Sequence, residues 1–262
     1  MKAFPLRPLP FPVSAAVTCH NHSTWSDGEN SLREMALAAR EAQAGYFGIS
    51  DHLVLSPYGE CSWSVSPAQF CRYREEAYAL KRELQSEGFR MLVGVEADYF
   101  RETWAELQAL LERYPLDYVI GAVHYVGSFP VDSSAENWRG LDEKGQYAVW
   151  QGYIAKMREL ARAGGCSFIA HLDLPKKYGY PMPATLAGEM AECLREIAAA
   201  GIPVELNTAG LDKPCGEFYP APGLLRQAQE LGIPVVLSAD AHSTRDIVRH
   251  FKEARLLLHG MA

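Results

Sequence analysis

The sequence lacks the features that mark several large protein classes. It has no uninterrupted apolar run long enough to span a membrane, and its proline-rich start, MKAFPLRPLPFP, does not provide the continuous apolar helix of a secretion signal. Six cysteines are present, but no C-x-x-C pair occurs. We therefore expect a cytoplasmic protein with reduced thiols rather than disulfides or a redox motif.

Positive charge is also scarce. Lys and Arg number 25 against 32 Asp and Glu, which gives a formal net charge of −7. This balance argues against sequence-independent nucleic-acid binding, which usually needs a basic face. It does not exclude a small phosphate ester as a ligand, because bound metal ions can reverse the local electric field.

What the sequence does contain is a repeated pattern: a short apolar run, a polar stretch, an amphipathic segment, and then the next apolar run. This pattern is typical of alternating strands and helices. Strands are predicted within residues 15–22, 46–52, 90–98, 117–124, 166–173, 202–207 and 233–242. Helices are predicted near residues 31–43, 67–86, 102–113, 146–163, 184–200, 222–231 and 244–258. Glycine follows four of these helices, in AQAGYFGI, QSEGFRML, AAAGIPVEL and QELGIPVVL.

Seven successive strand–helix units without an intervening linker predict one domain over residues 1–262. A parallel α/β sheet closed into a TIM-like barrel is favoured over an open doubly wound sheet. The open sheet is the alternative, but no G-x-G-x-x-G follows the first strand, as a dinucleotide-binding fold of that kind would require.

Histidine is concentrated at the ends of the predicted strands. In TCHNHSTWSDG, alternation along a strand points His20 and His22 to the same side. Six of the eight histidines lie at strand ends, and the remaining two, His250 and His259, fall in the last predicted helix, where solvent exposure or helix capping accounts for them. In a parallel barrel the C-terminal strand ends meet at one face, so distant residues would converge there.

These positions predict a metal centre. Nine candidate ligands are His20, His22, Asp27, His52, Glu96, His124, His171, Asp240 and His242. Taken singly, a strand-end histidine is more often a hydrogen-bonded structural residue; the recurrence at strand after strand is what favours metal binding. Histidine and carboxylate ligands without cysteine suit Zn, Mn or Fe in a hydrolytic site, and nine ligands suggest two or three ions.

The ordered set H-x-H, D, D-H, E, H, H and D-x-H, spread over nearly the whole chain, resembles the polymerase and histidinol phosphatase (PHP) family of metal-dependent phosphoesterases. The resemblance implies a distorted seven-stranded barrel with three divalent ions at the C-terminal strand ends. It assigns the first ion to His20, His22, Glu96 and Asp240, the second to Glu96, His124 and His171, and the third to Asp27, His52 and His242. Asp51 then falls outside the ligands and is expected to support the site without binding metal, while its neighbour His52 is the ligand.

Three segments, DYVIGAVHYV, IAHLDLPKKYG and VELNTAGLDKPCGEFYPAP, resemble the histidinol-phosphate phosphatase branch of the family. The resemblance implies a phosphoric monoester hydrolase that releases phosphate from L-histidinol phosphate in histidine biosynthesis. Members of this branch carry a basic residue where Asp212 stands, and Lys176, Lys177 or Lys213 could replace it. Asn207 is a further expected substrate contact.

The expected catalytic residues are Glu96, which would bridge two ions, and Asp240 or His242, which would relay a proton to the leaving group. A cationic substrate also calls for aromatic faces and a carboxylate near the site; the candidates are Trp63, Tyr99, Phe100, Tyr125 and Glu217. Two alternatives stay open: a phosphoesterase acting on a sugar phosphate, a nucleotide or a cyclic phosphate, and a non-catalytic metal-binding module. We expect no nucleic-acid or membrane partner and either a monomer or a homodimer.

Overall fold

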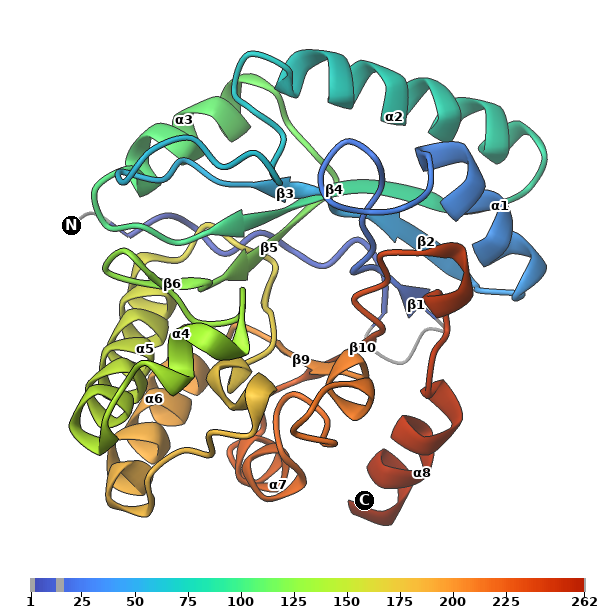
Figure 1. Ribbon diagram of the computed structural model, residues 1–262. Coiled ribbons are helices and arrows are strands. Elements are labelled where there is room, and N and C mark those ends of the chain that lie inside the picture. Colours follow the sequence, from blue (N-terminus) through green and yellow to red (C-terminus); the bar gives the residue numbers. More distant parts are fainter. Residues whose placement is uncertain (1–2, 13–16, 262) are drawn as a thin grey trace.

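The apolar runs form the strands of one parallel sheet. The computed structural model describes residues 3–12 and 17–261 (Figure 1). The main path of the sheet has seven strands in the order β1 (Val17–Thr18), β2 (Tyr46–Ile49), β4 (Met91–Asp98), β5 (Tyr118–Ala122), β8 (Phe168–Ile169), β9 (Val204–Asn207) and β10 (Val235–Ser238). A short strand, β3 (His52–Leu53), also pairs with β4. The prediction of seven parallel strands is confirmed.

The first and last strands approach each other and nearly close the sheet into a barrel. A parallel bridge joins Asn21, just after β1, to Ala241, just after β10. The backbone N–H of His22 donates to the carbonyl of Ala241 at 2.8 Å, and the N–H of Ala241 donates to the carbonyl of His20 at 3.1 Å. The barrel is therefore distorted, because β1 and β10 are joined only through the residues that follow them, and these residues include predicted metal ligands.

Eight α-helices surround the sheet. They are α1 (Leu32–Glu41), α2 (Phe70–Ser86), α3 (Trp104–Arg113), α4 (Ala135–Arg139), α5 (Glu143–Ala163), α6 (Ala187–Ala200), α7 (Pro222–Glu230) and α8 (Phe251–Met261) among the described residues. Figure 1 shows α1, α2 and α3 above the strands and α5, α6 and α7 below them. Buried apolar side chains of the longer helices, such as Leu84 of α2 and Leu160 of α5, pack in one core with those of the strands. None of the described helices combines the length and apolar character needed to cross a membrane.

The inside of the barrel is filled by large side chains. The ring of Tyr118 stacks near that of Phe168, and its hydroxyl donates to the carbonyls of Cys19 and Ile49 at 2.7 and 2.9 Å. A Cβ atom on Gly94 would lie 2.6 Å from the Tyr118 ring, so the strand needs glycine there. This packing blocks the barrel below the strand ends and leaves its chemistry to the open face above them.

The predicted helix over residues 244–258 is confirmed only from Phe251 onward, as part of α8. A 3-10 turn, η4 (Thr244–Asp246), precedes α8, and His250 between them has a left-handed φ of 55°. The break lets Arg249 donate to the carbonyls of Ala239 and Asp240, contacts that a continuous helix would carry away. His250 accordingly lies outside the helix, and its imidazole contacts Asp212 at 2.8 Å.

Other differences are local. Gly201 and Gly232 end α6 and α7 with positive φ, as predicted, but Gln43 rather than Gly45 takes the left-handed conformation after α1. The sequence analysis also missed α4 and the short hairpin of β6 (Tyr125–Val126) and β7 (Phe129–Pro130). These elements belong to the long connection after β5, where no regular apolar period is present.

Candidate metal centre

The carboxylate of Glu96 lies at the centre of the open face. Glu96 is in β4, a strand that is buried along its whole length, and only 1% of its surface is exposed. Ring nitrogens of five histidines lie within 3.6 Å of its oxygens: His20, His22, His52, His124 and His171. A buried carboxylate needs partners of this kind, since burial of an uncompensated charge is costly.

The first predicted ligand set is brought together by three strand ends. Nε2 of His20 lies 3.2 Å from Glu96 Oε2 and 3.5 Å from Asp240 Oδ1. Nε2 of His22 lies 3.6 Å and 3.3 Å from the same two oxygens. Two imidazoles and two carboxylates thus face one small volume, an arrangement suited to a divalent ion.

The second predicted set meets at the other oxygen of Glu96. His171 Nε2 lies 2.8 Å from Oε1, and His124 Nε2 lies 3.6 Å from it. The backbone N–H of His124 donates to the carboxylate of Asp98 at 2.9 Å. Asp98 therefore holds the segment that carries His124, a role that the sequence analysis missed.

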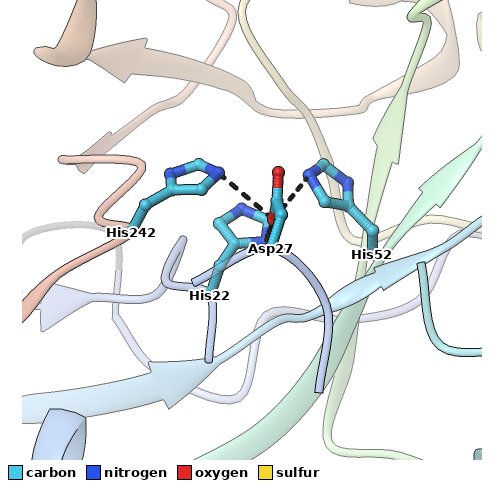
Figure 2. Close-up of side chains that lie close together, drawn as sticks. All are labelled: His22, Asp27, His52 and His242. Carbon is cyan, nitrogen blue, oxygen red and sulfur yellow. Dashed lines mark ion pairs between the residues drawn. The ribbon is translucent and has the colours of Figure 1, made fainter. Parts of the chain in front are cut away.

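The third set surrounds Asp27. Figure 2 shows its carboxylate between the rings of His242 and His52, with His22 beside it. Asp27 Oδ1 lies 3.4 Å from His242 Nε2, 3.6 Å from His52 Nε2 and 3.8 Å from His22 Nδ1. His22 and His52 also face Glu96 through their other nitrogens, so these two imidazoles lie between the third set and the first two. The resemblance had placed His22 with the first ion alone.

The donor atoms fit divalent metal ions. Among the described residues, His20 Nε2, His22 Nε2 and Glu96 Oε2 are buried and have no hydrogen-bond partner. Such atoms carry a desolvation cost unless something binds them. Because the three atoms face one another and all offer lone pairs once the histidines are neutral, one cation can satisfy them together.

Electrostatics favour a cation at these positions. Burial would lower the pKa of His124, but the carboxylates of Glu96, Asp98 and Asp132 together outweigh burial and raise the pKa to about 10. Burial would also lower the pKa of His242, but the carboxylate of Asp27 and that of Asp240 together raise it to about 9. His22 lies in the same cluster with a pKa lowered to about 3, first by burial and then by positive neighbours. The carboxylates of the cluster therefore favour the binding of protons or metal cations from solvent.

Glu205 supports the centre from below, and the sequence analysis missed it. This fully buried residue of β9 accepts from His20 Nδ1 at 2.6 Å, from the backbone N–H of His171 at 2.8 Å, and from the hydroxyl of Ser238. Bonding at Nδ1 leaves Nε2 of His20 unprotonated and directed at the metal position. The only sequence signal was a glutamate inside the apolar run IPVELN.

Two ligands have a backbone conformation that is unusual for residues other than glycine. His171 has a φ of 22° and Asp240 a φ of 50°. The carbonyl of His171 accepts from the hydroxyl of Tyr153 at 2.9 Å, and the carbonyl of Asp240 lies 3.0 Å from Nδ1 of His242. Strained backbone of this kind persists where surrounding contacts hold it, and it clusters at functional sites.

Asp51 fixes the loop that carries Asp27. Its buried carboxylate accepts from the backbone N–H and hydroxyl of Ser23 at 2.7 and 2.8 Å, and from the hydroxyl of Ser26 at 2.6 Å. Burial raises the pKa of Asp51, and these hydrogen bonds oppose the rise. The residue thus acts through loop 23–28 rather than through a metal-directed oxygen.

A cavity of about 510 Å³ opens above the metal centre. Lys177 and Lys213 line it, and Lys177 Nζ contacts Asp132 at 3.0 Å. Lys176 is not among the lining residues; its ammonium lies 2.9 Å from the carboxylates of Asp173 and Glu217. The cavity therefore offers two of the three predicted lysines to a ligand.

Asn207 is buried beside the centre rather than exposed in the cavity. Its side-chain amide donates to Glu205 Oε2 and to Asp240 Oδ2, both at 3.1 Å, and its amide oxygen accepts from the backbone of Ala209. These contacts orient the Asp240 carboxylate.

The aromatic candidates divide into two pairs. Trp63 and Tyr125 line the cavity with nearly parallel rings, 15° apart in plane and 6.4 Å between centroids. Tyr99 and Phe100 are buried and are not among the lining residues, nor is Glu217. Tyr178, Tyr219 and Arg249 are among the lining residues that were not predicted from the sequence.

Comparisons with known proteins agree with this geometry. A probable histidinol-phosphatase of Deinococcus radiodurans is 34% identical over 222 residues, which cover 85% of this chain and 84% of that protein. The histidinol-phosphatase of Bacillus subtilis is 26% identical over 70% of this chain and 75% of its own. The fold matches that of a histidinol phosphate phosphatase from Lactococcus lactis, solved with zinc, L-histidinol and phosphate, with a TM-score of 0.78, 21% identity and 94% of each chain covered.

A protein-family model also matches most of the chain. The PHP domain model aligns with residues 18–209, which run from β1 to the segment after β9 and include most of the candidate ligands. Together with the parallel strands, their distorted closure and the ligands at the strand ends, this match identifies the chain as a member of the PHP domain family.

Proposed function

We propose that the chain is a metal-dependent phosphomonoesterase that hydrolyses L-histidinol phosphate to L-histidinol and phosphate. The observation that carries the proposal is the convergence of ligand sets around Glu96 and Asp27 at the floor of a cavity lined with lysine and aromatic side chains. The 34% identical Deinococcus protein and the zinc, histidinol and phosphate of the Lactococcus structure support the choice of substrate.

We assign one divalent ion to each set, giving three, with Zn, Mn or Fe as the fitting elements. When bound, such ions supply Lewis-acid stabilisation of the phosphoryl oxygens and an activated water as nucleophile. The chain contributes the placement: Glu96 offers one oxygen to each of two sets, and His22 and His52 lie between those sets and Asp27.

The remaining roles fall to residues that line the cavity. Lys177 or Lys213 would bind phosphate oxygens, and the faces of Trp63 and Tyr125 would receive the cationic, aromatic end of histidinol. The leaving alcohol needs a proton, which His242 or Asp240 would relay; 37% and 17% of their side chains are exposed. Asn207 would act by orienting Asp240.

The test is phosphate release from L-histidinol phosphate, measured together with the metal content of the protein. The proposal expects about three ions per chain and a strong preference for this ester over sugar phosphates, nucleotides and cyclic phosphates. Equal rates on unrelated esters would favour a general phosphoesterase. A protein that holds no metal and cleaves none of these esters would be a non-catalytic module instead.

A further inference from the structure

Arg249 is the one arginine among the described residues that line the cavity. It lies between η4 and α8, at the helix break that the sequence did not predict. Only 15% of its side chain is exposed. A largely buried arginine in a cavity above a metal centre needs an explanation, because buried guanidinium groups are normally paired with an anion.

The guanidinium is held in place by the backbone of the metal centre. Its Nη2 donates to the carbonyl of Ala239 at 2.7 Å and lies 3.4 Å from the carbonyl of Asp240. The carbonyl of Arg249 itself accepts from the hydroxyl of Thr208 at 2.6 Å. These contacts fix the side chain beside a metal ligand before any substrate arrives, which lowers the entropic cost of binding.

Several of its N–H groups remain unused. Nε is buried and has no hydrogen-bond partner among the described residues. The carboxylates of Asp212 and Asp246 lie 3.4 Å from Nε and 3.5 Å from Nη1, at ion-pair rather than hydrogen-bond range. Asp212 has a closer partner in His250, at 2.8 Å. A guanidinium has five donors in a planar fork that matches the oxygens of a phosphate.

We propose that Arg249 binds the phosphate group of the substrate, together with Lys213. The inference rests on the proposed function. The phosphate-binding cation would lie on the segment before α8. Asp212 occupies the position where a basic residue was expected. Of the two cavity lysines, Lys177 is already engaged by Asp132, while Lys213 is in no ion pair with the described residues. Arg249 and Lys213 are therefore the cations with donors to spare.

The experiment uses the metal-loaded protein and inorganic phosphate as the probe. Arg249→Gln should weaken phosphate binding about tenfold or more, as measured by calorimetry and by product inhibition. Arg249→Lys should have an intermediate effect, because a point charge remains. The KM for the ester should rise more than kcat falls. The matched control is Arg245→Gln, an arginine on the same segment with 80% of its side chain exposed, which should leave phosphate binding unchanged.

Metal content separates binding from positioning. If Arg249→Gln keeps its metal ions and its phosphate affinity, the inference is overturned. The same conclusion follows if the variant loses metal while its loaded fraction still binds phosphate normally, since Arg249 would then only position Asp240. Lys213→Gln provides an independent test and should also weaken phosphate binding. The Lys213 side chain makes no hydrogen bond to the backbone among the described residues, so its loss should not disturb the metal centre. If the protein binds phosphate in an Arg249-dependent way but does not cleave histidinol phosphate, the proposed substrate is rejected and the role of Arg249 in phosphate binding is retained.

Discussion

The metal centre has a buried part and an open part, and they are built differently. His20, His22 and Glu96 are at most 1% exposed and come from strands or strand ends. Asp27 and His242, by contrast, have 36% and 37% of their side chains exposed and come from loops. Strands hold a ligand more rigidly than loops do. We infer that ions in the buried part are bound more tightly and that the ion beside Asp27 exchanges more readily.

The supports of the two parts differ in the same way. Glu205 holds His20 and His171 with charged hydrogen bonds inside the barrel. The open part depends on Asp51, which ties Ser23 and Ser26 in the loop before Asp27. Each part can therefore be weakened without direct removal of a ligand from the other.

The largest effect is expected from Glu96→Gln, which breaks the buried part. The substitution removes the one carboxylate that faces two ligand sets, so hydrolysis should fall about 10³-fold or more and bound metal should drop by more than one ion per chain. Phosphate release and elemental analysis measure both. Glu102→Gln, at an exposed glutamate after the same strand, is the control and should behave as wild type. Normal metal content in Glu96→Gln would contradict the central role of this residue.

Asp27→Asn should break only the open part. We expect the loss of about one ion per chain, with a fall in activity of about 100-fold, because the buried sets stay intact. A stepwise chelator titration of the wild type should remove this same ion first, and the variant should lack that step. Simultaneous loss of all ions in the titration would show that the two parts do not differ in affinity.

Glu205→Gln should weaken the buried part from outside its ligands. An amide offers one acceptor oxygen where the carboxylate serves several donors, so the apparent metal affinity should fall about 10- to 100-fold. Competition with a chelator of known affinity measures the change. Glu230→Gln, an exposed residue at the end of α7, provides the matched control. Unchanged affinity would mean that the strands alone orient His20.

Metal binding should release protons. The pKa values of His124 and His242 are raised to about 10 and 9, so both rings are charged at neutral pH before metal binds. A histidine must be neutral to bind a metal ion. Each proton displaced from a histidine therefore makes the metal affinity fall about tenfold for each unit that the pH is lowered. The raised values also stabilise the metal-free fold below about pH 6.5, an advantage lost as the pH rises through 9 to 10. Calorimetry in buffers of different ionisation enthalpy measures the number of protons released. A release of zero protons per metal ion would contradict the prediction.

The smallest effect is expected from Asp51→Asn. The amide keeps part of the hydrogen bonding to Ser23 and Ser26, so only the ion beside Asp27 should bind more weakly, by about tenfold or less. The Asp27 step of the chelator titration should shift while the later steps stay in place. A shift of the tight steps instead would place the influence of Asp51 in the buried part.

Much of the fold followed from the sequence because apolar periodicity and strand-end histidines are local signals. The seven strands, the parallel order and the convergence of ligands such as His20 and Asp240 were predicted correctly. The helix before Phe251 was not, because residues 244–250 have a helical pattern but are held open by contacts of Arg249 with Ala239 and Asp240. Tertiary contacts of this kind leave no trace in local propensity.

The supporting residues were harder to predict than the ligands. Glu205 and Asp98 each lie within or at the end of an apolar run, where a single carboxylate has no spacing that distinguishes it. Lys176 and Lys177 are adjacent in sequence, yet only Lys177 lines the cavity. Which neighbour faces a ligand depends on the 3-10 turn η1 (Leu174–Tyr178), whose geometry the sequence pattern does not specify.

The bridge between Asn21 and Ala241 has a consequence for how the protein is made. Ligands at the N-terminal side of this bridge, His20 and His22, are synthesised long before Asp240 and His242 on its other side. A nascent chain that already contains His20, His22 and Glu96 still lacks Asp240, the fourth member of the first ligand set. Full metal loading must therefore wait until translation has passed the last strand, and a chain truncated before residue 240 would leave the ribosome unable to complete that set.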